Sequence, residues 1–123
     1  MTAPESFRDL TGQLAQLAPP EKPTYILAEL NDLLTAIRAE EVEQLEAPAI
    51  TDPYLANYVA AMVELAAHRR GVHPPDWTPT IEPFAEPRFA VPWMSLRAHL
   101  LTASPVPFRR RNIFIDSSLG DRV

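Results

Sequence analysis

Residues 52–71 read DPYLANYVAAMVELAAHRRG, and this stretch carries the signals for both ends of one helix. The Asp52 side chain can accept hydrogen bonds from the first free backbone N–H groups, and Pro53 suits the first helical position. Gly71 is the typical residue just beyond a helix end. Between them, apolar residues form a broad face, and several alanines allow close approach of other helices. We therefore predict a helix over residues 53–70 that packs in the core.

Two further amphipathic helices are predicted before this stretch. The first covers residues 4–18, because Phe7, Leu10, Leu14 and Leu17 recur at helical spacing before a Pro-Pro pair. The second starts after Pro23 and continues as a single helix of about 20 residues until Pro48, with acids on its outer face. The sequence thus predicts an all-α fold, with residues 1–71 forming a small three-helix bundle.

The chain changes character after Gly71. Eight of its 14 prolines lie between residues 74 and 107, which excludes regular sheet or a long helix there. The same stretch holds many large apolar groups, so we expect a proline-rich irregular strap packed over the helices, with a short fourth helix over residues 92–102. The tail at residues 113–115 has strand propensity and needs a partner: its own helices, a symmetry mate or another protein. Residues 1–71 and 72–123 together are expected to form a single domain.

Composition limits the possible functions. The chain has 123 residues, 46% of them hydrophobic, and contains no cysteine, which excludes disulfides and thiol chemistry. Its three glycines are isolated, so no glycine-rich phosphate loop can form. The first residues lack the pattern of a secretory signal, and no apolar run is long enough to cross a membrane. We expect a cytoplasmic protein.

Charge is divided unevenly along the chain. Residues 1–67 carry 11 acids and three bases, a net charge of -8, while residues 68–123 carry eight arginines and five acids, a net charge of +3. Two interpretations stay open. Either the arginines of the strap lie against the carboxylates of the helices, or arginines and aromatic residues together form a binding surface, as in interface hot spots.

Candidate catalytic groups are sparse. His68 and His73 do not have the spacing of a metal site, and His99 has no evident partner. Acid pairs such as Glu40-Glu41 lie on the charged face of a helix, and no serine stands in a Gly-x-Ser-x-Gly motif. We expect no enzyme activity, no cofactor and no metal.

The densest charged feature is Arg109-Arg110-Arg111, flanked by Phe108 and Phe114. Arginines in this pattern can contact phosphates, with aromatic rings available for base stacking. They can equally pair with carboxylates, either of the second helix or of a partner. The isoelectric point of about 5.1 opposes steering toward nucleic acid.

Several segments resemble an uncharacterised bacterial family. The resemblance covers roughly residues 50–116 and is carried by AAHRRGVHPPDW, EPRF, LRAHLL and, most specifically, SPVPFRRRNIFID. Members are short helical proteins or the C-terminal regions of Xre-type helix-turn-helix regulators, and some are encoded beside toxin–antitoxin genes. The resemblance implies a regulatory or antitoxin-like role, although residues 1–47 lack the basic recognition helix of a DNA-reading domain. The family has no agreed catalytic residues to carry over.

Together these features favour a non-enzymatic protein–protein interaction module. Its partner would be a protein, such as a toxin or a regulator, and a homodimer is also compatible with the sequence. The alternative is a nucleic-acid-binding regulator that uses the arginine tail. The partner-binding surface is predicted to combine the aromatic and arginine residues of the C-terminal half: Trp77, Phe89, Trp93, Phe108, Arg109, Arg110, Arg111 and Phe114.

Overall fold

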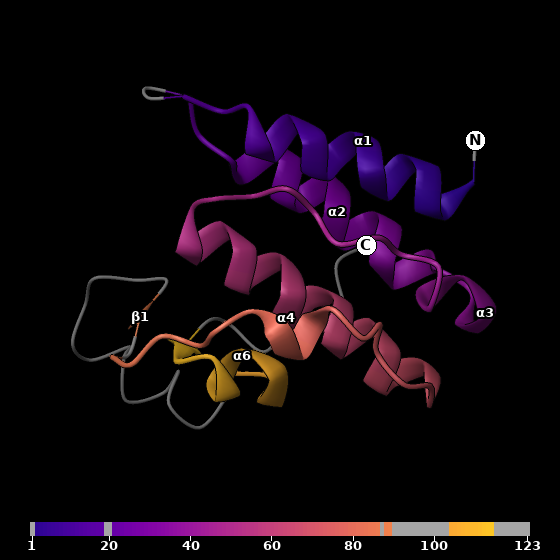
Figure 1. Ribbon diagram of the computed structural model, residues 1–123. Coiled ribbons are helices and arrows are strands. Elements are labelled where there is room, and N and C mark those ends of the chain that lie inside the picture. Colours follow the sequence, from indigo (N-terminus) through magenta and orange to yellow (C-terminus); the bar gives the residue numbers. More distant parts are fainter. Residues whose placement is uncertain (1, 19–20, 87, 90–103, 115–123) are drawn as a thin grey trace.

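The fold is mostly helical, as a computed structural model of the chain shows (Figure 1). The structure describes residues 2–18, 21–86, 88–89 and 104–114. This architecture confirms the predicted all-α class. Within the described residues, no helix is long and apolar enough to cross a membrane.

The first helix, α1 (Ala3–Ala15), is confirmed but ends three residues before the predicted boundary at residue 18. Thr2 and Glu5 form a capping box, in which each side chain accepts a hydrogen bond from the other residue's backbone N–H at 3.3 Å. These two bonds satisfy donors that a helix start otherwise leaves free. Phe7 and Leu14 turn inward and are buried.

The prediction of one continuous second helix is wrong. The structure has α2 (Thr24–Ala36) and the short α3 (Ala39–Val42), separated by an extended backbone at Ile37 and Arg38. Arg70 of another helix binds the chain at this break: its guanidinium donates from Nε to the Ile37 carbonyl oxygen at 2.8 Å and from Nη2 to that of Thr35. Arg70 therefore satisfies carbonyls at the end of α2, and the chain turns there. The apolar residues beyond the break still reach the core, so the sequence period does not reveal it.

Helix α4 (Pro53–Arg70) has the bounds predicted for the 53–70 helix. The Asp52 carboxylate accepts from the backbone N–H groups of Tyr54 and Leu55 at 2.8 and 3.3 Å. Gly71 closes the helix at φ 68°, a left-handed conformation that strains any residue with a Cβ. Because α4 carries buried residues around most of its circumference, other elements must cover it on several sides.

Figure 1 shows how these elements surround α4. Helices α1 and α2 pack against each other, and α2 and α3 pack against α4. The 3-10 helix η1 (Thr78–Thr80) and the helix α6 (Val106–Arg110) also contact α4, with α6 on the side away from α1. The C-terminal half thus completes the cover of the central helix.

The tail finds its partner within the chain. Strand β2 (Ile113–Phe114) pairs in parallel with β1 (Arg88–Phe89), with Arg88 opposite Ile113. The chain enters β2 through Asn112 at φ 60°, a conformation that asparagine tolerates better than most residues, and the Asn112 amide donates to the Phe84 carbonyl oxygen. The partners predicted for this tail were the chain's own helices, a symmetry mate or another protein. The segment that pairs with it belongs instead to the strap. The predicted helix over residues 92–102 lies outside the described residues.

Candidate partner-binding surface

The three consecutive arginines at the end of α6 occupy two different environments. Arg111 is only 4% exposed, whereas Arg109 and Arg110 are exposed. Successive residues of a helix point about 100° apart, so one arginine of such a run can face the core while its neighbours face solvent. The run is therefore not one uniform basic patch.

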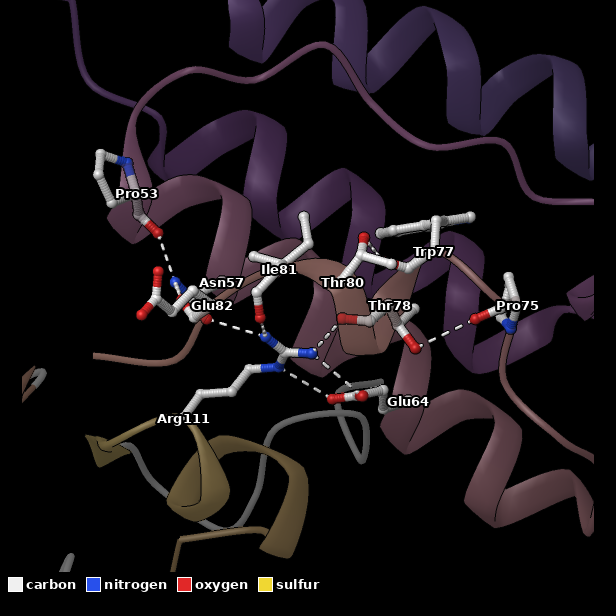
Figure 2. Close-up of polar contacts among 10 residues, drawn as sticks. All are labelled: Pro53, Asn57, Glu64, Pro75, Trp77, Thr78, Thr80, Ile81, Glu82 and Arg111. Carbon is white, nitrogen blue, oxygen red and sulfur yellow. Dashed lines mark hydrogen bonds and ion pairs between the residues drawn. The ribbon is translucent and has the colours of Figure 1, made fainter. Parts of the chain in front are cut away.

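The buried Arg111 guanidinium reaches the face of α4 (Figure 2). Its Nε and Nη2 donate to the two Glu64 carboxylate oxygens at 2.9 and 3.1 Å, a bidentate ion pair. Nη1 donates to Asn57 Oδ1 at 2.9 Å. This geometry uses the planar guanidinium fork that lysine lacks.

The remaining donors of Arg111 go to the strap. Nη1 also donates to the Ile81 carbonyl oxygen at 3.0 Å, and Nη2 donates to that of Thr78 at 2.6 Å. All five N–H groups of the guanidinium thus have an acceptor. A buried charge is tolerated when it is paired and hydrogen-bonded in this way.

Asn57 joins the same network from α4. Its Nδ2 donates to the Pro53 carbonyl oxygen at 2.9 Å and to that of Glu82 at 3.0 Å, while Oδ1 accepts from Arg111. Both ends of the buried amide are therefore used. We call Arg111, Glu64 and Asn57, with the strap carbonyls they bind, the Arg111 clasp. It ties α4, the strap and the end of α6 together.

The clasp decides what Glu64 can do chemically. Both oxygens of the carboxylate accept from Arg111, so it is held in a salt bridge within the fold. This arrangement settles for Arg111 the choice between the two interpretations of the arginines: it pairs with a carboxylate of its own chain. The carboxylate belongs to α4, however, and not to the second helix considered in the sequence analysis.

Arg109 and Arg110 have a different role. Both are exposed, and neither has an ion-pair or hydrogen-bond partner for its side chain among the residues that the structure describes. Val106, on the same helix, is 44% exposed, which is high for a large apolar residue. Helix α6 thus presents two cations and an apolar side chain outward.

A cavity of about 380 Å³ lies where α6 faces the C-terminal half of α4 and the start of the strap. Its described lining contains the ionisable side chains of His68 and Arg110, the paired carboxylate of Glu64, and an apolar wall. The apolar wall consists of Val72, Pro74, Val106 and Pro107. The volume is within the range of cavities that bind ligands or side chains of partners. Because Arg111 neutralises Glu64, the uncompensated charge among the described residues of this lining is positive.

The aromatic residues predicted for the surface divide as well. Phe108 is fully buried, with its ring edge-to-face against Tyr58 at a centroid distance of 5.1 Å. Trp77 is half-buried: its ring lies 6.5 Å from that of Phe7, and its Nε1 donates to the Leu45 carbonyl oxygen at 2.8 Å. The burial of Phe108 and Arg111 removes both from the exposed set that the sequence predicted, because each completes the packing against α4.

Three aromatic residues of the predicted set remain: Phe89, Trp93 and Phe114. The side chains of Phe89 and Phe114 and the whole of Trp93 lie outside the described part of the structure. Of the predicted surface residues, the structure therefore brings Arg109 and Arg110 together in the open and keeps Trp77 partly accessible.

Tyr54 and Tyr58 form a cluster with the rings of Phe84 and Phe108 along one face of α4. Burial raises the pKa of Tyr58 to about 12, with a smaller contribution from Tyr54. Burial also raises the pKa of Tyr54. Both hydroxyls are therefore neutral at physiological pH, which suits a packing role.

The groups weighed as catalytic in the sequence lie apart. His68 and His73 are both exposed. The Arg38 Nε atom lies 3.6 Å from Glu40 Oε1 and 3.0 Å from Glu41 Oε1, so these two acids form ion pairs with Arg38. No group of three or more possible metal ligands occurs among the described residues. His99 lies outside them.

Sequence reasoning missed Asn57, Glu64 and Thr78. A signal for two of them was present: Asn57 and Glu64 are seven residues apart, which places them on one face two helical turns apart, within a helix that is otherwise mostly apolar. Polar groups in such a position need buried partners. Thr78 contributes a backbone carbonyl, which no side-chain pattern indicates.

Comparisons with protein-family models, with curated proteins and with solved structures find no match to this chain. The resemblance to an uncharacterised bacterial family therefore stays a prediction.

Proposed function

We propose that this chain is a non-enzymatic protein-binding module whose contact surface centres on α6. The observation that carries the proposal is the contrast within one arginine run. All donors of the Arg111 guanidinium are used by the clasp, while Arg109 and Arg110 stay exposed on the helix that carries the exposed Val106, and Arg110 lines a cavity. Arginine next to apolar surface is typical of the residues that dominate protein interfaces.

The clasp supplies the rigidity that such a surface needs. By fixing the end of α6 against α4, it fixes the backbone from which the two exposed arginines extend before a partner arrives. A surface that is already ordered loses less conformational entropy on binding. The partner's carboxylates would then pair with Arg109 and Arg110, and its apolar side chains would cover Val106.

Several finer features belong to the same proposal. The scaffold is a small bundle of helices over residues 1–71, in which α2 and α3 stand where the second of the three predicted helices was expected, and the proline-rich strap over residues 72–123 presents the surface. The resemblance to short proteins encoded beside toxin–antitoxin genes supports an antitoxin-like role, or that of an accessory to a transcriptional regulator, in the cytoplasm. Mechanistically, the protein would act by covering a surface of its partner.

The test is affinity purification of the tagged full-length chain from its native host, with a charge-reversal control. We expect at least one protein to co-purify with the wild type and to be lost with Arg109→Glu/Arg110→Glu. Arg8→Glu, which reverses an exposed charge on α1, should retain it. A chain that emerges alone at every salt concentration, or a partner retained equally by both variants, contradicts the proposal.

Nucleic-acid binding is the second candidate, because the same exposed arginines could contact phosphates. It predicts binding that weakens steeply with salt and is lost with Arg109→Ala/Arg110→Ala. The net charge of -5 weighs against it. Gel shifts at low salt decide the point, since the absence of any shifted band there excludes this candidate.

A further inference from the structure

The cavity between α4 and α6 has an unusual balance of charge and apolar surface. Among the residues that the structure describes, the one carboxylate in its lining, that of Glu64, is already paired with Arg111. The other ionisable side chains of this described lining are His68 and Arg110, and neither has a hydrogen-bond or ion-pair partner among the described residues. An occupant that carries a negative charge would therefore meet an uncompensated guanidinium.

The rest of the wall is apolar. Val72 and Pro74 come from the chain just after α4, and Val106 and Pro107 come from α6. These side chains offer no hydrogen bonds, so they favour an aliphatic group on the occupant. A bare phosphate would leave this wall uncovered, whereas an acidic residue beside an aliphatic one would use both parts of the lining.

The binding surface also continues beyond the cavity. Val106 lies at the cavity and is 44% exposed, and Arg109 is exposed on the same helix. An occupant that filled the cavity and also reached Arg109 would be longer than a small organic acid. This extent favours a segment of polypeptide.

We infer that the cavity between α4 and α6 receives an acidic side chain, with an adjacent aliphatic side chain, from the partner protein. The carboxylate pairs with the Arg110 guanidinium, and the aliphatic group packs on Val72, Pro74 and Val106. The inference rests on the proposed function and adds to it the chemistry of the partner's contact segment.

The test uses the full-length protein and a short blocked peptide that alternates leucine and glutamate. Binding is followed by NMR through the methyl signals of Val72 and Val106, because these report on the cavity wall even when binding is weak. We expect shifts confined to the cavity region. The affinity for the peptide, obtained from these shifts, should fall about tenfold with Arg110→Gln, as expected for loss of a hydrogen-bonded charge partner.

Three matched controls make the result specific. Arg8→Gln removes the same charge from an exposed position on α1 and should leave peptide binding unchanged. The same peptide with glutamine in place of glutamate should bind about tenfold more weakly to the wild type. A single-stranded oligonucleotide should leave the two valine methyl signals unchanged.

Equal binding of the glutamine peptide, equal binding by Arg110→Gln, or stronger shifts with the oligonucleotide would each overturn the inference. Its failure is distinguishable from failure of the proposed function. A host protein that depends on Arg109 and Arg110, together with no peptide response at the cavity, would leave the protein-binding role in place and assign its contact to the surface outside the cavity.

Discussion

At the scale of single residues, Arg111 shows how one side chain can join distant parts of a small protein. Its guanidinium binds Glu64 and Asn57 of α4 and two backbone carbonyls of the strap. Its neighbours Arg109 and Arg110 are chemically identical but remain exposed. The role of each arginine is therefore set by the direction in which α6 points it, and not by its residue type.

This contrast makes a direct prediction for stability. Arg111→Ala leaves the Glu64 carboxylate without its cation and Asn57 without a donor, which should lower the free energy of unfolding by about 3–5 kcal/mol. Arg111→Lys should recover only part of this, because an ammonium cannot form the bidentate pair. Urea denaturation followed by circular dichroism measures both.

Arg109→Ala is the matched control, since it removes an exposed arginine from the same helix. It should change the free energy of unfolding by no more than about 0.5 kcal/mol. Equal unfolding midpoints for Arg109→Ala and Arg111→Ala would mean that the clasp does not support the fold.

At the scale of elements, α4 organises the molecule because both its ends are specified locally and most of its surface is buried. Asp52 caps its start and Gly71 closes its end in a left-handed conformation. The second helical segment shows the opposite case. At its break, the Ile37 carbonyl oxygen accepts a hydrogen bond from Arg70, 33 residues away in the sequence.

Gly71, at the end of α4, and Gly12, within α1, predict opposite effects of substitution by alanine. At Gly71, with φ 68°, an added Cβ meets no atom within 4 Å, so Gly71→Ala costs backbone strain alone. We expect it to destabilise the protein by about 1–2 kcal/mol. Gly12 lies within α1, also in open space, and Gly12→Ala should stabilise the protein by up to about 1 kcal/mol.

Thermal unfolding of the two variants beside the wild type checks these signs. The melting temperature should fall for Gly71→Ala and rise for Gly12→Ala. A rise for Gly71→Ala would show that the end of α4 is not held in the left-handed conformation, and a fall for Gly12→Ala would contradict the open helical site at Gly12.

At the scale of the whole molecule, the C-terminal half is part of the core. Phe108 and Ile113 are fully buried within it, and Trp77 and Phe84 pack against its edge. The helices of residues 1–71 therefore do not cover α4 by themselves. The fold depends on segments separated by long stretches of sequence.

Truncation after Gly71 tests this dependence. The shortened chain would expose the face of α4 that now contacts η1 and α6, and would leave Asn57 and Glu64 without Arg111. We expect an aggregating or molten product that binds a hydrophobic dye and unfolds without cooperativity. A monomeric fragment with a sharp unfolding transition would contradict this.

The sequence by itself determined the features that depend on neighbouring residues. It specified the helical class, the bounds of α4 and the start of the proline-rich region, whose described helices and strands are short, because caps, helical period and proline act within a few residues. The tertiary structure alone decided that Arg111 is buried, that α2 ends at Ala36 and that Arg110 lines a cavity. Those outcomes depend on partners up to 54 residues away, and only the folded chain brings these groups within hydrogen-bond distance.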